Sequence, residues 1–342
     1  MVSRTPEYLA QNVLRPVARA AIFLTVTVPE GREADVGDAL TDVPSLIRAV
    51  AFRVPEGQLS CVTGIGAEFW QRAYPDLEPP ADLHPFIPLD GGKHRAPRTP
   101  GDLLFHIRSM QVDMCFELAR QLQLRFGDSI EIVDEVHGFR YWDDRDLLGF
   151  VDGTENPDAP LAQVEATLIG DDDPVWTGGS FVIVQKYLHD LTTWDAISVE
   201  EQERVIGRTK LADIELPDDV KPSNSHVALN QVNDADGKQL QIVRDNLPFG
   251  RLDGEEFGTY FIGYAADPGV TEEMLRNMFL GKPAGNYDRI LDFSTAVTGC
   301  LFFVPPAGFL EEPEAYAGDE TSDETPTEHQ PATDGSLNIG GL

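Results

Sequence analysis

One segment near the middle of the chain, residues 139–160, holds too many charged and turn-forming residues to be a core element. Its centre reads Gly149-Phe150-Val151-Asp152-Gly153-Thr154. Glycines on both sides of an aspartate let the backbone approach a ligand closely and aim the carboxylate. Asp152 is therefore a candidate site residue, although an ordinary turn produces the same Asp-Gly pattern.

His226 is a candidate metal ligand. It follows a polar turn in KPSNSHVALN, and a neutral imidazole there could bind iron. A lone histidine is, however, more often a hydrogen-bonded structural residue. The other six histidines form no HxxxH or HExxH pattern with it, so a dedicated zinc or di-iron site is poorly supported; they are His84, His94, His106, His137, His189 and His329.

Arg244 lies in LQIVRDNLPFG, where strand alternation places a guanidinium among apolar residues. A buried arginine requires an anion, whereas an arginine on the exposed side of an edge strand does not. The sequence leaves both readings open.

The elements that position these residues follow from hydrophobic periodicity. In the first half, strands and helices alternate as β-α-β-β-α-β; their ranges are 20–28, 34–51, 59–66, 102–109, 110–126 and 129–139. In the second half the same order recurs over 179–190, 191–206, 240–249, 258–266, 271–280 and 300–305. Although no residue-level repeat is visible, the sequence predicts an α+β fold of two ferredoxin-like units with antiparallel sheets.

Composition excludes several classes of function. The 342 residues are 42% hydrophobic and 25% charged, which is typical of a globular protein, and the net charge of −32 disfavours nucleic acid and anionic membranes as partners. Residues 1–16 contain no signal-peptide core and no apolar run is long enough to span a bilayer, so we expect a cytoplasmic protein. The three cysteines stand in apolar runs without CxxC spacing, which predicts buried, reduced thiols; they are Cys61, Cys115 and Cys300.

The C-terminal region changes character. Residues 310–333 are acidic and poor in apolar side chains, so we expect a disordered linker. The chain then ends in DGSLNIGGL, which restores apolar side chains among glycines and suggests a docking peptide. A frayed terminus without a function is the alternative.

Taken in order, GFVDG, NSHVALN and VRDN resemble the dye-decolourising peroxidase family, in particular its compact B-type branch. Further family-like segments include VIVQKYLHD, EEQERVIGRTK, GTYFIGYA and GNYDRILDFSTAVTG, so the resemblance covers residues 15–305. It implies a DyP-type dimeric α+β barrel with one haem b per chain. On this basis we expect an N-terminal ferredoxin-like unit over residues 1–148 and a C-terminal, haem-binding unit over residues 149–309.

The same resemblance implies roles for individual residues. His226 would be the proximal axial ligand of the haem iron, and Asp288 in NYDR would accept its other ring N–H. Asp152, Arg244 and Asn246 would form the distal set, in which a base moves the peroxide proton and Arg244 stabilises developing charge and keeps Asp152 ionised. Weaker likenesses point to contacts with the haem edge or propionates; they concern Arg208, Gly153 and Thr154.

The implied activity is peroxidase chemistry. Hydrogen peroxide would be reduced and bulky organic donors oxidised, such as dyes and phenolic or lignin-like compounds, with Mn(II) as a further donor. The peptide over residues 334–342 is similar to those that direct such peroxidases into encapsulin shells, so we expect shell cargo within a cytoplasmic nanocompartment and, from the sheets, a homo-oligomer.

Three alternatives stand beside this prediction. A haem storage or handling protein could use the same fold and ligand, but would gain little from a charged pair facing the iron. A chlorite-dismuting or haem-decarboxylating enzyme is disfavoured by Asp152. A purely structural cargo role is allowed by the tail and disfavoured by the complete distal set.

Overall fold

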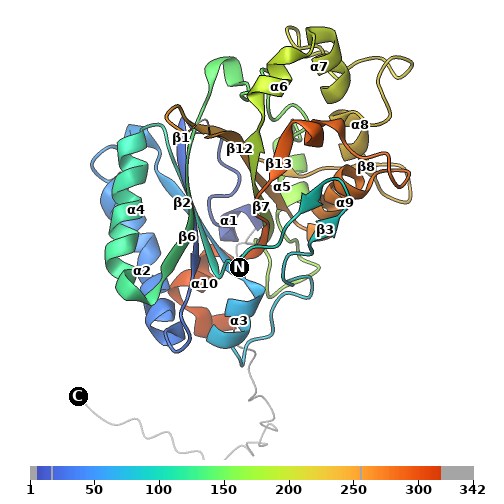
Figure 1. The fold of residues 1–342 in the computed structure, drawn as a ribbon. Helices are drawn as coiled ribbons and strands as arrows, with labels where there is room; N and C mark the ends of the chain where they lie inside the picture. The colour runs from blue at the N-terminus through green and yellow to red at the C-terminus, as the bar shows by residue number, and fades with distance from the viewer. Residues whose placement is uncertain (1–5, 17, 255, 317–342) are drawn as a thin grey trace, which may run out of the picture.

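We describe the fold from a computed structural model of the chain, whose described residues are 6–16, 18–254 and 256–316 (Figure 1). The predicted targeting peptide over 334–342 and most of the predicted linker lie outside the described residues. Within the described part of the chain, no helix combines the length and hydropathy required to cross a bilayer.

The first half forms one ferredoxin-like unit. Its elements are β1 (Ala20–Thr27), α2 (Glu33–Ala51), β2 (Ser60–Gly66), β5 (Leu103–Ser109), α4 (Val112–Phe126) and β6 (Glu131–Phe139). The strands pair antiparallel in the order β2-β5-β1-β6. Helix α2 buries Val36, Leu40 and Val43, at the spacing of one helical face, and packs beside α4 against the sheet (Figure 1).

The second half repeats this plan. Its main elements are β7 (Ser180–His189), α6 (Leu191–Ala196), α7 (Val199–Ile206), β10 (Val243–Arg244), β12 (Glu256–Ala265), α9 (Pro268–Leu280) and β14 (Cys300–Val304). The strand order β10-β12-β7-β14 matches that of the first unit, with β11 (Leu247–Arg251) added to β12 and β13 (Ser294–Ala296) added to β7. The predicted pair of antiparallel ferredoxin-like units is therefore confirmed.

Among the described residues, the other short elements are α1 (Pro6–Leu9), α3 (Ala67–Ala73), β3 (Leu89–Asp90), β4 (Arg95–Ala96), α5 (Pro160–Thr167), α8 (His226–Asn230), β8 (Val232–Asn233), β9 (Gln239–Leu240) and α10 (Ala307–Glu311), together with several 3-10 turns.

The two units share one sheet and one interior. Strand β14 pairs with β2, with Phe302 opposite Gly66, so the sheet continues from one unit into the other. The sheet also curls until β6 contacts β11, where Gly138 lies so close to Leu247 that a Cβ on the glycine would come within 2.8 Å of the leucine Cβ. Aromatic side chains fill the enclosed space, including Phe23 stacked on Tyr260 at 4.2 Å between ring centroids.

The cysteine prediction is confirmed, because Cys61, Cys115 and Cys300 are free and buried. Burial raises the pKa of the Cys61 thiol to about 12, so this thiol is inert near neutral pH.

Three predicted ranges were wrong in detail. The helix over 191–206 breaks at Ile197, where Ser198 caps the N-terminus of α7 by accepting the N–H of Glu201. The strand over 240–249 divides into β10 and β11. The predicted linker begins too early, because Leu310 is buried in α10 and residues 313–316 form a 3-10 turn whose Tyr316 stacks on Trp176.

Candidate functional site

Within the described part of the chain, a large cavity lies mainly in the second unit, with an empty volume of about 1310 Å³ that includes the open space at its mouth. It is bounded by the loop after residue 145, by β7, β12, α8 and α9, and by the β10 strand. Its walls are largely apolar, and a few polar side chains converge on it, which is typical of a cofactor site. The cavity brings together seven of the eight predicted residues, namely Asp152, Gly153, Thr154, Arg208, His226, Arg244 and Asn246.

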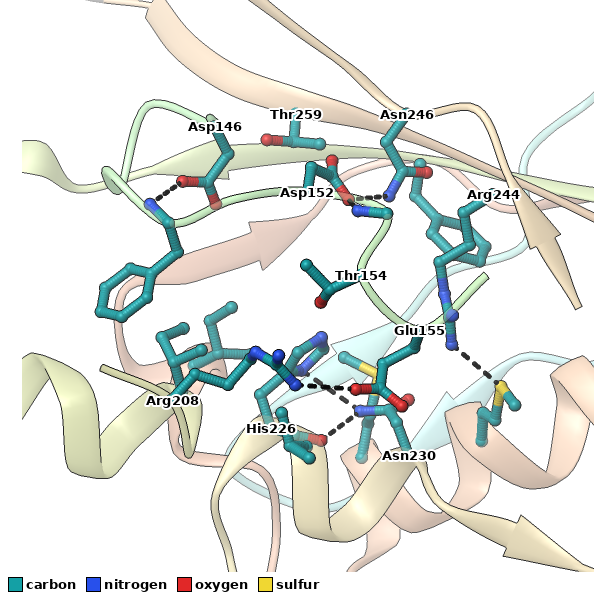
Figure 2. A pocket seen from close by; sticks show the side chains of 18 of the residues that line it. Asp146, Asp152, Thr154, Glu155, Arg208, His226, Asn230, Arg244, Asn246 and Thr259 are labelled. Carbon is teal, nitrogen blue, oxygen red and sulfur yellow. Dashed lines mark hydrogen bonds and ion pairs between the residues drawn. The ribbon is translucent and has the colours of Figure 1, made fainter. Parts of the chain in front are cut away.

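The polar residues stand on opposite walls. Figure 2 shows Asp152, Asn246 and Arg244 on one side of the cavity, and His226 with Asn230 on the other. The space between them is lined by apolar side chains such as Phe261.

His226 is the first residue of α8, directly after its N-cap, Ser225. Its Nδ1 lies 2.7 Å from Oδ2 of Asp288, while 37% of the His226 side chain remains accessible because it faces the cavity. Burial opposes a charge on this imidazole, but the Asp288 charge and hydrogen bond outweigh burial and raise the pKa of His226. With Nδ1 held by Asp288, Nε2 is the nitrogen available to a ligand in the cavity.

Asp288, the eighth predicted residue, lies behind His226 rather than in the cavity wall. It is fully buried, which excludes the alternative of a surface aspartate in a turn. Its Oδ1 accepts the N–H of Ile290 at 3.0 Å, so the carboxylate that orients His226 is itself fixed. Asn230, four residues after His226, donates to the His226 carbonyl at 2.8 Å. The i,i+4 spacing within NSHVALN was a signal that could have identified Asn230.

Asp152 is carried by a loop that requires glycine. Gly153 has a φ of +78°, a conformation that other residues adopt only with strain, and its N–H donates to Oδ1 of Asp152 at 2.7 Å. Asn246 donates to the same carboxylate oxygen at 3.3 Å, and its own Oδ1 accepts the N–H of Ile262 at 3.0 Å. Burial raises the pKa of Asp152 even though the Arg244 charge works in the opposite direction. The Arg244 charge thus favours the ionised form of Asp152, as expected, while burial favours the protonated form. A carboxyl group under these opposing influences is suited to exchanging a proton.

Arg244 is in the cavity wall and not on a solvent-exposed edge. Among the described residues it makes no ion pair within 4.0 Å, and its Nη2 donates only to Sδ of Met274, at 3.5 Å. Burial lowers the pKa of Arg244, although a guanidinium keeps its charge throughout the physiological range. A cationic group without a carboxylate partner is thus available to stabilise negative charge inside the cavity.

Asn156 is a site residue that the sequence reasoning missed. Its Oδ1 accepts the backbone N–H of Arg244 at 2.9 Å, and its Nδ2 donates to the Arg244 carbonyl at 2.8 Å. The side chain thus pairs with Arg244 as a neighbouring strand would and fixes the distance between the Asp152 loop and β10. In the sequence, only its position directly after the Asp152 loop, in GTENP, indicates that Asn156 belongs to the site.

Arg208 lies at the cavity but is already paired. It contacts Oε1 of Glu155 at 3.0 Å and Oδ1 of Asp213 at 2.8 Å. A contact between Arg208 and an acidic group of a cofactor stays a prediction, and it would compete with these two carboxylates.

Asp146 also lines the cavity and braces the loop that carries Asp152. Its Oδ1 accepts the N–H of Phe150 at 3.0 Å. Beneath the loop, Nε1 of the buried Trp194 donates to the Leu148 carbonyl at 2.9 Å. Burial, and secondarily the charge of Asp152, raises the pKa of Asp146 to about 7.

This shift predicts a specific pH dependence. Because the pKa of Asp146 is higher in the folded protein than the ordinary value of 3.8, the protonated form stabilises the fold, and this stabilisation is lost as the pH rises from about 4 to about 7. The variant Asp146→Asn cannot ionise. Its melting temperature relative to wild type should therefore increase between pH 4.5 and pH 7.5 in the haem-loaded protein. The exposed Asp158→Asn is the control, and parallel pH profiles of Asp146→Asn and wild type would contradict the prediction.

Comparison with known proteins gives consistent results. Two family models cover most of the chain, "Dyp-type peroxidase, N-terminal" at residues 10–140 and "Dyp-type peroxidase, C-terminal" at residues 143–309. A dye-decolorizing peroxidase from Rhodococcus erythropolis is 55% identical over 334 residues, which are 98% of this chain and 97% of that protein.

Solved structures also match this chain over most of its length. The encapsulated DyP-type peroxidase from Mycobacterium smegmatis matches with a TM-score of 0.87 and 59% identity, over 89% of this chain and 98% of that one. A DypB variant from Rhodococcus jostii RHA1 in complex with heme matches with a TM-score of 0.85 and 56% identity, over 88% and 97% of the two chains. A DypB variant in complex with manganese matches with a TM-score of 0.86 and 57% identity, over 88% and 98%.

Proposed function

Because this chain belongs to the Dyp-type peroxidase family and is a haem peroxidase with one haem per chain, we propose that it reduces hydrogen peroxide in the cavity between His226 and Asp152. The electrons come from bulky organic donors, such as dyes and phenolic or lignin-like compounds. Mn(II) is included among the donors because a similar structure is a complex with manganese.

The residues present fit a haem b. The cavity walls are mainly apolar and a few polar side chains converge on them, as expected for a large, flat, apolar cofactor with acidic edge groups. His226 presents an imidazole to the cavity from one wall, backed by the buried Asp288. We assign His226 as the axial ligand and Asp288 as the group that fixes its tautomer and makes it more electron-donating. Gly153, Thr154 and Arg208 are assigned to the edge and propionates of the haem.

A haem bound here would supply the redox chemistry, by which two electrons pass from the donors to each peroxide. The protein moves the proton. Asp152 accepts it from the inner oxygen of peroxide and delivers it to the outer oxygen, directly or through one water. Arg244 stabilises the negative charge that develops on the departing oxygen, and Asn246 holds the Asp152 carboxylate in place.

The observation that carries this proposal is the distal wall itself. A half-buried guanidinium with no ion-pair partner among the described residues stands with an aspartate of raised pKa on the wall opposite His226. A haem storage or handling protein has no use for such a pair, because storage requires only the axial ligand and the apolar walls. The same argument disfavours a purely structural cargo role.

The proposal is tested by stopped-flow absorbance of the haem-loaded protein mixed with hydrogen peroxide. We expect rapid loss of the ferric Soret band and its return when a dye or phenolic donor is added. Haem that stays bound but does not react with peroxide would favour storage or handling instead. Rapid reaction with chlorite but not with peroxide would favour a chlorite-dismuting enzyme.

We also propose that the protein is cargo of an encapsulin shell in the cytoplasm, bound through residues 334–342. Two observations support this: the apolar DGSLNIGGL ending after an acidic stretch, and the similarity to an encapsulated peroxidase. Self-association into a homo-oligomer stays a prediction.

Deletion of residues 334–342 should abolish loading into the shell and leave peroxidase activity unchanged, because these residues lie outside the haem-binding unit. Co-expression with the shell protein followed by size-exclusion chromatography measures loading. A second variant, in which only Leu337, Ile339 and Leu342 are replaced by serine, tests whether apolar contacts bind the shell. If they do, this variant should also fail to load. Normal loading of the deletion variant would contradict the proposal.

A further inference from the structure

Asp245 separates the two distal residues Arg244 and Asn246, yet it points away from the cavity. Alternate residues of an extended backbone face opposite sides, so Arg244 and Asn246 line the cavity while Asp245 enters the barrel interior. There Asp245 is 4% exposed, and its Oδ2 accepts a hydrogen bond from Nη1 of Arg108, which is 2% exposed. Arg108 belongs to β5 of the N-terminal unit.

The same arginine holds a third segment. Its Nη2 donates to the backbone carbonyl of Asn12, so one guanidinium joins β5, the segment before β1 and the connection between β10 and β11. Few backbone hydrogen bonds tie the connection between β10 and β11 to the rest of the sheet. Strand β10 has two residues, Val243 and Arg244, in register with β12, and Asp245 adds one N–H donated to the Ile262 carbonyl at 3.1 Å.

The ion pair is poorly explained by stability. A buried ion pair is often no more stabilising than apolar residues of the same volume, because desolvation offsets the attraction between the charges. This cluster is also only partly satisfied: within the described residues, Nε of Arg108, Oδ1 of Asp245 and Nε2 of His106 have no hydrogen-bond partner. What the pair does provide is a defined geometry between the three segments that it joins.

The surrounding groups leave the pair as the only charges in the cluster. His106 is fully buried, its Nδ1 lies 2.8 Å from the hydroxyl of Tyr264, and burial together with the Arg108 charge lowers its pKa well below the usual value. Burial also raises the pKa of Tyr264. With His106 and Tyr264 neutral, the geometry of the cluster is set by the attraction between Arg108 and Asp245.

We propose that the Arg108–Asp245 pair is a positioning device for the distal site: it fixes the backbone from which Arg244 and Asn246 reach over the haem. A strand of the N-terminal sheet thereby contributes to a site whose lining residues all lie at or after Asp146. The inference rests on the proposed function for its importance to peroxide cleavage, but the placement of Arg244 can be measured without any reaction.

The test uses the haem-loaded full chain and the variant Asp245→Asn. The first readout is the affinity of the ferric protein for fluoride, a small anion that reports hydrogen bonding from Arg244 on the distal side. The second is the second-order rate constant with hydrogen peroxide. Because misplacement by about 1 Å costs on the order of 10²-fold at a reacting centre, we expect the rate constant to fall by at least about tenfold. The fluoride affinity should fall by about tenfold as well, because the anion loses a hydrogen bond from a charged group.

A double-mutant cycle with Arg244→Leu separates positioning from general damage. If Asp245 acts through Arg244, Asp245→Asn has little further effect on fluoride affinity in the Arg244→Leu background. An equal loss in both backgrounds, or unchanged fluoride affinity in Asp245→Asn, would overturn the proposal. If wild type binds fluoride but does not react with peroxide, the proposed function fails while the fluoride cycle still decides the positioning role.

Two controls keep the test decisive. Asp102 is 8% exposed and pairs with Arg72 at 3.2 Å outside the cavity, so Asp102→Asn should lower the melting temperature without changing either readout. If Asp245→Asn does not fold because Arg108 is left unpaired, the charge-free combination Arg108→Met with Asp245→Leu replaces it, with the same expected losses.

Discussion

Replacement of His226 by alanine should yield a folded protein that has lost its axial ligand and most of its haem. The imidazole is the group on its wall with a nitrogen free to bind iron, and Asp288 is committed to orienting it. Haem stoichiometry after gel filtration and the position of the Soret band measure the effect, and added imidazole should partly restore the axial band. Because α8 keeps its Ser225 cap in the variant, we expect the apo fold to survive.

His189 provides the matched control. It also lines the cavity, but both of its ring nitrogens are occupied, by Ser294 at 2.8 Å and Thr259 at 2.9 Å. Burial lowers the pKa of His189 to about 4, so its imidazole is uncharged near neutral pH. His189→Gln should retain the axial ligation. An unchanged haem spectrum in His226→Ala, or its loss only in His189→Gln, would refute the assignment of His226.

Arg244→Leu and Asp152→Ala should each slow the reaction with peroxide while leaving haem bound. General acid–base catalysis contributes about 10²- to 10⁴-fold and preorganised charge stabilisation about 10²- to 10³-fold, so losses of this order are expected in the second-order rate constant. Which loss is larger is left to the experiment. If both residues serve the same step, the double variant should be little slower than the worse single variant.

The pH profile distinguishes Asp152 from Arg244. A base works when ionised, so the wild-type rate should rise with pH through the pKa of Asp152, which burial has raised above the ordinary aspartate value. This limb should disappear in Asp152→Ala and persist in Arg244→Leu. Arg251→Leu, which removes a 67% exposed arginine, is the control for charge alone. Single variants that react within twofold of wild type would favour haem handling over peroxide cleavage.

The sequence predicted the elements well where an element is buried along its length, on both faces of a strand or on one face of a helix. The strands around 20–28 and 300–305 are apolar runs, and the helix around 34–51 shows a continuous buried face. It predicted poorly where the structure depends on a cap or on distant contacts. A serine cap divides the helix after Ile197, and Leu310 is ordered because it packs into a core that local composition does not reveal.

The candidate site shows the same contrast between residues that local sequence identifies and residues that act through distant contacts. Asp152, His226 and Arg244 stand out by residue type within unusual local sequence, and the structure gathers them around one cavity. Asn156 acts through its contacts with the Arg244 backbone, and Arg108 meets Asp245 only because the sheet closes on itself. No local pattern encodes a contact between residues 137 positions apart, so sequence periodicity could not predict it.

The pairing of β14 with β2 has a consequence for synthesis of the chain. The edge of β2 formed by Ile65 and Gly66 stays unpaired until the ribosome has produced residues 300–304, long after the rest of the N-terminal unit is complete. An open strand edge is a template for pairing with other chains. The nascent protein therefore depends on rapid synthesis of its C-terminal half or on a chaperone that binds the exposed strand edge. The two halves expressed as separate polypeptides should aggregate unless they are produced together.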